Sequence, residues 1–134
     1  MEKTTLQADS VAKPMGPYSQ GIKTYGGILL FISGQVPENA QGDIVGVGDF
    51  RVQAVQVMEN LKAMVEAGGG TLRDMVKLTI FLTDIRNYKV ISEVRAQYFE
   101  GAYPASTLVE VNRLVRPEWM LEIEAIAVVE RSES

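Results

Sequence analysis

The 134-residue chain contains no cysteine and no histidine. The lack of cysteine excludes disulfide bonds, thiolate catalysis and cysteine-ligated metals. The lack of histidine removes the most common general base, the serine–histidine–aspartate triad and most zinc sites. The sequence therefore offers no thiol or imidazole chemistry and no evident metal site.

Positive charge is also scarce, with 13 lysines and arginines against 17 acidic residues and a net charge of −4. Binding to a nucleic-acid backbone needs a basic surface, and no lysine or arginine run is present, so we expect no nucleic-acid partner. No apolar run approaches the roughly 20 residues that span a bilayer, and the N-terminal segment lacks a signal-peptide core. We therefore expect a cytoplasmic protein with no membrane partner.

The composition is that of a folded domain, with 46% hydrophobic and 22% charged residues. The length is typical of one domain, and no linker, repeat or low-complexity segment divides it, so residues 1–134 are predicted to form a single domain.

Alternation, helical spacing and capping residues predict the main elements. Asp49 is a good N-cap, and Gly68 begins a triple-glycine stop for a helix over residues 50–67. The other predicted elements are strands at 27–33, 75–82, 107–111 and 120–129 and a helix at 85–99. The apolar strand at 27–33 is expected to be covered on both faces. This order predicts an α+β fold with two helices packed on one face of a mixed β-sheet.

The last predicted strand carries two glutamates on one side. Glu122 and Glu124 are two residues apart, so their backbone positions lie roughly 7 Å from each other. Partial burial would raise their pKa values toward a range useful for proton transfer. The alternative is that both carboxylates face water.

Three further features are candidates for a site. The turn at residues 16–21 presents Tyr18 and a serine, although such a segment can be only a turn. Ser33 and Gly34 end an apolar strand and offer a hydroxyl and backbone N–H groups to an anion or a carbonyl, but glycine is common at strand ends. Arg95 falls on the apolar stripe of the second helix. We interpret it as snorkelling at the core rim, the alternative being an inward cation that lines a pocket.

Six short motifs occur in order along the chain: Gly16–Gly21, Ser33–Gln35, Asn60–Ala63, Tyr103–Ala105, Val109–Val111 and Glu122–Ala127. Together they resemble the Rid family, also called YjgF or L-PSP, whose founding members are imine and enamine deaminases. The resemblance covers about residues 14–129.

The resemblance implies a chorismate-mutase-like fold and a homotrimer with ligand clefts between subunits. It places Tyr18, Ser33 and Gly34 in the cleft, with Ser106 and Thr107 also binding substrate. It makes Glu124 the catalytic residue, which positions the water that attacks the C=N carbon and helps to move protons. No cofactor and no covalent intermediate is implied, and the ligand would be a small carboxylate or an imine or enamine metabolite.

One position departs from the family pattern. Active members carry Pro-Ala-Arg-Ser, in which the arginine binds the substrate carboxylate, whereas this chain has Ser106 in the arginine's place. Losing two charge-assisted hydrogen bonds should weaken binding of an imino acid by roughly a hundredfold or more. Ser92 also stands where the deaminases often have asparagine. The sequence therefore predicts slow or no ammonia release from 2-iminobutanoate or 2-iminopropanoate, and a gain of activity on Ser106→Arg. Arg95 is the one candidate for a substitute cation.

Two functions remain open at this point. The first is a hydrolytic deaminase of imines or enamines, with a neutral or differently anchored ligand. The second is a trimer that binds a metabolite or another protein without turnover. Endoribonuclease activity, which one of the family names suggests, is not expected from a net acidic chain without histidine.

Overall fold

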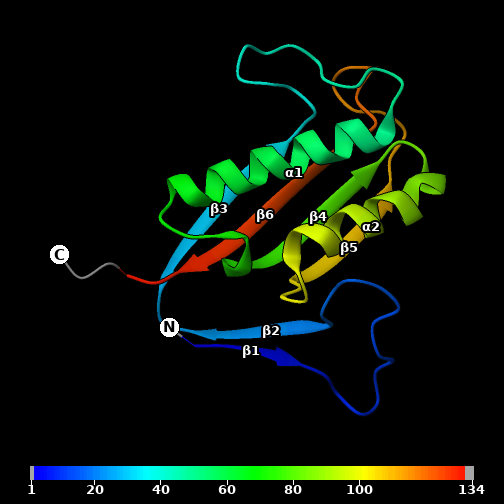
Figure 1. The fold of residues 1–134 in the computed structure, drawn as a ribbon. Helices are drawn as coiled ribbons and strands as arrows, with labels where there is room; N and C mark the ends of the chain where they lie inside the picture. Colours follow the sequence, from blue (N-terminus) through cyan, green and yellow to red (C-terminus); the bar gives the residue numbers. More distant parts are fainter. Residues whose placement is uncertain (1, 132–134) are drawn as a thin grey trace.

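The computed structural model describes residues 2–131, which form two sheets and two α-helices. The larger sheet is mixed and has the strand order β3–β6–β4–β5, with α1 and α2 on one of its faces (Figure 1). Its strands are β3 (Ile28–Gln35), β4 (Met75–Leu82), β5 (Ala105–Glu110) and β6 (Leu121–Val129). The helices are α1 (Phe50–Ala67), α2 (Tyr88–Phe99) and the 3-10 turns η1 (Leu72–Asp74) and η2 (Ile85–Asn87). The second sheet pairs β1 (Glu2–Leu6) with β2 (Gly21–Tyr25).

Helix α1 confirms the predicted start, end and buried face. The Asp49 side chain accepts a hydrogen bond from the Val52 N–H, which satisfies one of the free donors of the first turn. The helix ends at Gly68. Four apolar residues that recur at helical spacing on one face are all fully buried: Ala54, Met58, Leu61 and Val65.

The core lies between the helices and the covered face of the sheet. Alternate residues of β4 and β6 point into it, as the period-two pattern predicts. Those on β4 are Leu78, Ile80 and Leu82, and those on β6 are Leu121, Ile123, Ala125 and Ala127. The two central strands therefore tie both helices to one sheet.

The prediction that the strand at 27–33 is covered on both faces is wrong for the single chain. The side chains of Leu29 and Phe31 are 58% and 75% exposed on the face opposite the helices. Both helices pack on the other face, so one side of β3 stays open to solvent (Figure 1). An exposed apolar surface of this kind commonly marks an interaction surface.

Three details differ from the sequence prediction. The β1–β2 pair was not predicted, because its short and mostly exposed strands lack a clear apolar alternation. The predicted helix at 85–99 is divided into η2 and α2, and Asp84 caps the first of these. Strand β5 begins two residues before the predicted start at 107. Within residues 2–131, no helix is both long and apolar enough to cross a membrane.

Candidate active site

The loop that joins β1 to β2 is tied to the start of β5. Ser19 forms an isolated β-bridge with Ala105, and its N–H donates to the Pro104 carbonyl at 3.0 Å. The Ser19 hydroxyl donates to the Tyr103 carbonyl at 2.6 Å. These bonds hold Tyr18 beside β5, so the segment at 16–21 is more than a turn.

A hollow of about 320 Å³ lies between this loop, α2 and β5. We name it the β5 pocket. The loop contributes two of its residues, and α2 and β5 contribute two each. The lining residues are Tyr18, Gln20, Tyr88, Arg95, Ser106 and Leu108. Ser106 pairs with the buried Leu78 of β4, so its side chain points to the face covered by the helices.

Arg95 is buried in this pocket, with only 2% of its surface exposed. Its Nη1 donates to Ser106 Oγ at 3.0 Å, and its Nη2 lies 3.5 Å from Ser92 Oγ. Its Nε is buried and has no hydrogen-bond partner. The snorkelling interpretation is therefore wrong, because the side chain turns inward toward β5, where the small Ser106 leaves room for it.

The charge of Arg95 has no acidic counterpart nearby. No carboxylate of residues 2–131 lies within 4.0 Å of its guanidinium. Burial lowers the pKa of Arg95, while the hydroxyls of Tyr88 and Tyr18 act in the opposite direction. Because a guanidinium does not lose its proton in proteins, the pocket contains a positive charge at neutral pH.

A second group of predicted residues meets at a β-bulge between β3 and β6. Ile32 pairs with Ala125 and Gln35 pairs with Ile123, so Ser33 and Gly34 together lie opposite Glu124. Bulges often lie beside active sites, where they redirect side chains. Ser33 and Glu124 also line a shallow hollow of about 230 Å³ on the open face of the sheet.

The two glutamates of β6 have different surroundings. Glu124 is exposed, whereas Glu122 is half-buried and lies so close to Gly34 that a Cβ there would overlap its carboxylate. Burial raises the pKa of Glu122, and the charge of Glu124 adds to the rise. The sequence left open whether the two glutamates are partly buried or face water. In the structure Glu122 is partly buried and Glu124 faces water.

The raised pKa of Glu122 predicts a pH-dependent stability. A carboxyl whose pKa is higher in the folded state stabilises the fold while protonated, and this contribution is lost as the pH rises from about 4.5 through the raised pKa. We expect Glu122→Gln to raise the melting temperature at pH 7 and to change it little at pH 4. Thermal unfolding at both pH values checks this, with the exposed Glu66→Gln as the control. An equal shift at both pH values would contradict the account.

The structure does not bring these two groups together within one chain. Ser33 and Gly34 lie on the edge strand β3, three strand spacings or about 14 Å from β5 at the opposite edge, and Glu124 on β6 lies two spacings or about 10 Å from β5. Ser106 also faces the helices, whereas Glu124 lies on the open face. Thr107 is on the open face too, where its hydroxyl accepts from Lys77 Nζ at 2.7 Å.

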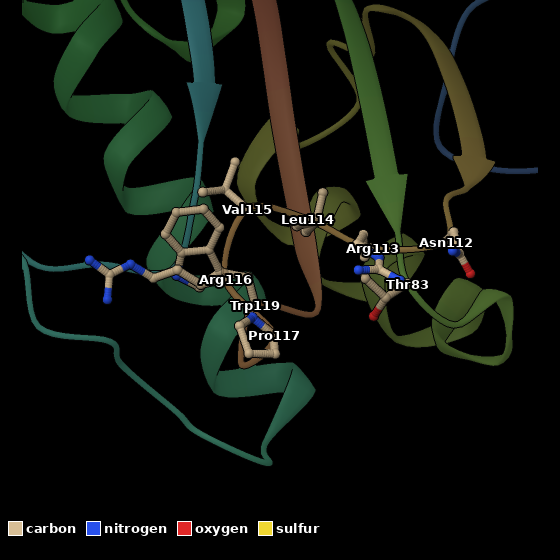
Figure 2. Close-up of a pocket in the computed structure, with 8 residues that line it drawn as sticks. All are labelled: Thr83, Asn112, Arg113, Leu114, Val115, Arg116, Pro117 and Trp119. Atoms are coloured by element: carbon tan, nitrogen blue, oxygen red, sulfur yellow. The ribbon is translucent and has the colours of Figure 1, made fainter.

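A larger hollow, of about 420 Å³, contains none of the predicted site residues (Figure 2). It is formed by Thr83 and the segment at 112–119. Figure 2 shows the Arg116 guanidinium pointing away from Thr83 and Asn112, and Arg116 Cζ lies 5.9 Å from the centroid of the Trp119 ring. Over residues 2–131, no group of three or more acidic side chains is placed to hold a metal ion.

Comparison with known proteins assigns the family. The family model described as Endoribonuclease L-PSP matches residues 9–129. The chain belongs to the Rid/YjgF/L-PSP family. The 2-iminobutanoate/2-iminopropanoate deaminase of Dermatophagoides farinae is 33% identical to it, over 96% of this chain and 98% of the relative.

Solved structures of Rid proteins agree with this assignment. The Rid protein YyfB from Yersinia pestis superposes with a TM-score of 0.89 at 31% identity, covering 96% of this chain and all of its own. TdcF from E. coli, solved with bound serine, gives a TM-score of 0.70 at 38% identity, covering 96% of this chain and 99% of its own. The predicted α+β Rid fold with two helices on one face of the sheet is confirmed.

Within the Rid fold, the predicted site residues fall into the two groups already described. Tyr18 and Ser106 line the β5 pocket, while Ser33, Gly34 and Glu124 meet at the bulge. Sequence reasoning missed Tyr88 and Gln20 as pocket residues. Tyr88 lies at helical spacing from Ile91 and Arg95, a pattern that fits a core position equally well and so gives no specific signal of a site.

Proposed function

We propose that this Rid-family chain hydrolyses the C=N bond of a small imine or enamine, in clefts between the subunits of a homotrimer. The observation that carries the proposal is the separation of the two site groups within one chain: Ser33 and Gly34 lie on the edge strand opposite to that of Ser106, and Glu124 faces the other side of the sheet. A single complete site then requires the β5 pocket of one copy and the Ser33–Gly34 bulge of another.

A ring of copies satisfies this requirement. Contact between two different edges is a head-to-tail interface, and such interfaces form closed rings when the rotation between copies allows it. The exposed Leu29 and Phe31 lie on the open face of β3, and an assembly that covers this face would remove them from water. The homotrimer implied by the family resemblance meets both conditions.

In this cleft, Glu124 of one copy acts on a substrate held beside Tyr18 and Ser106 of the next. The carboxylate accepts a proton from water as the water oxygen bonds to the C=N carbon and the π electrons move to nitrogen. The proton then passes to nitrogen, which gives a carbinolamine. The remaining hydroxyl proton moves through Glu124 to the amino group as the C–N bond breaks, so ammonia leaves and the oxygen becomes the carbonyl of the product. The reaction consumes one water and involves no change of oxidation state.

Two relatives support a small substrate of this class. The mite relative is named for its action on 2-iminobutanoate and 2-iminopropanoate, and TdcF was solved with serine, a short amino acid with a carboxylate. The β5 pocket, at about 320 Å³, is of the size that takes small ligands. The substitution at Ser106 alone predicts slow turnover, but Arg95 provides a guanidinium in the same pocket, so we expect turnover to be retained.

Ammonia release tests the proposal directly. An amino-acid oxidase generates 2-iminobutanoate or 2-iminopropanoate in the assay, and the purified chain is expected to accelerate ammonia release above the enzyme-free rate. Light scattering is expected to give three times the 14.7 kDa chain mass. A folded trimer that releases no extra ammonia would favour a binding protein without turnover, and a monomer would contradict the cleft.

A further inference from the structure

We infer that Arg95 binds the carboxylate of the substrate, so that this chain selects anionic imino or enamino acids through a guanidinium supplied by α2. The inference rests on the proposed cleft and deepens it by naming the substrate class and the residue that recognises it. Strand β5, where the family's arginine would lie, contributes only Ser106.

The first argument is electrostatic. A buried charge is costly unless it is paired with an opposite charge and its hydrogen-bonding groups are satisfied. Arg95 is 2% exposed, yet its only hydrogen-bond acceptors are two serine hydroxyls, and its Nε has no partner. An anionic ligand in the pocket would supply the missing counter-charge.

The second argument is geometric. Arg95 lines an open hollow and is not sealed inside the core, so a ligand can reach it. A carboxylate accepts two parallel hydrogen bonds from one guanidinium edge, which is the strongest common pairing for this anion. Tyr18, Tyr88 and Ser106 line the same pocket, and each carries a hydroxyl, a group that can donate to a carboxylate. Leu108 provides an apolar wall beside them, which suits a short aliphatic substrate.

A purely structural role for Arg95 explains these observations less well. Elsewhere in the part of the chain that the structure describes, Arg51 and Arg86 each pair with a carboxylate although both are largely exposed. Arg95 is the buried arginine and has none. A residue kept only for packing would gain stability as methionine or leucine, since neither brings an uncompensated charge into the interior.

Calorimetric titration with 2-oxobutanoate, a stable carboxylate, tests the inference on the intact assembly. Arg95→Met is expected to weaken binding of 2-oxobutanoate by roughly a hundredfold or more, because two charge-assisted hydrogen bonds are lost. Arg95→Lys keeps the charge without the paired donors and should fall between Arg95→Met and the unmodified chain. Ser106→Ala is the matched control that removes the hydroxyl but keeps the guanidinium, and it should weaken binding about tenfold or less.

The neutral 2-oxobutanamide separates charge recognition from pocket shape. We expect Arg95→Met to change its affinity by less than about threefold. If the unmodified chain does not bind 2-oxobutanoate, or if folded Arg95→Met binds it as tightly as the unmodified chain, the inference is overturned. Arg95-dependent binding without ammonia release would contradict the proposed hydrolysis and leave the inference intact. Ammonia release by Arg95→Met at the rate of the unmodified chain would contradict the inference about Arg95 and leave the proposed hydrolysis intact.

Discussion

Replacing Glu124 by glutamine is expected to lower the rate of ammonia release from a 2-imino acid by about a hundredfold to ten-thousandfold. This is the range over which a positioned general base contributes to a reaction. Glutamine keeps the size and the hydrogen-bonding reach of the side chain but cannot accept the proton of the attacking water. Because the loss affects the chemical step, kcat should fall much more than KM rises, and steady-state kinetics would separate the two.

Glu122→Gln is the matched control for this prediction. It removes a carboxylate from the same strand and the same face, two residues away, and next to the same bulge. We expect it to lower kcat by less than about tenfold, because its half-buried carboxyl packs against Gly34. If Glu122→Gln were the slower of the two variants, the assignment of the general base to Glu124 would be wrong.

Ser106→Arg is expected to destabilise the chain, contrary to the gain of activity that the sequence alone predicts. Ser106 Oγ lies 3.0 Å from Arg95 Nη1, so a second guanidinium there would meet the first. Two like charges about 4 Å apart repel by about 4 kcal/mol at an effective dielectric constant of about 20. In a domain of this size that corresponds to a fall in melting temperature of roughly 15 °C.

Moving the charge instead of adding one should relieve this repulsion. The double variant Arg95→Met with Ser106→Arg returns the guanidinium to β5 and leaves a neutral side chain on α2. Its melting temperature should recover to within about 3 °C of the unmodified chain, and its affinity for 2-oxobutanoate to within about tenfold. Ser106→Met is the control for added bulk without charge. A stable Ser106→Arg single variant that binds 2-oxobutanoate more tightly than the unmodified chain would show that Arg95 does not occupy this position.

Local sequence patterns predicted those helices and strands whose apolar residues repeat regularly on one face and bury that face in the core. Helix α1 lies within its predicted bounds because Asp49 and Gly68 mark its ends and its apolar stripe meets the core. Strands β4 and β6 are central, and their burial alternates along most of their length, except at the start of β4 and the end of β6. Strands β1 and β2 carry no such pattern, because they pair with each other outside the main core.

The sequence names candidate site residues one by one, but it does not predict how they are arranged. The bulge at Ser33 and Gly34 depends on the register between β3 and β6, which a single strand sequence does not contain. The inward turn of Arg95 depends on the small side chain at 106, eleven residues away on another element. Helical spacing alone assigned Arg95 to the rim, because arginine at the edge of an apolar stripe usually reaches solvent.

In the proposal made above, Arg95 supplies the positive charge that the family resemblance would place at position 106. In this chain Ser106 and Arg95 depend on each other, because the Arg95 side chain fills the space that a larger residue at 106 would need. Ser106 and Arg95 are best interpreted together, because comparing residue 106 alone with the family motif overlooks the guanidinium that contacts it.

A crystal structure with bound 2-oxobutanoate tests the central claim most directly. We predict that the carboxylate lies in the β5 pocket with both of its oxygens within hydrogen-bond distance of the Arg95 guanidinium. A carboxylate bound elsewhere, with Arg95 still contacting only Ser106 and Ser92, would contradict it.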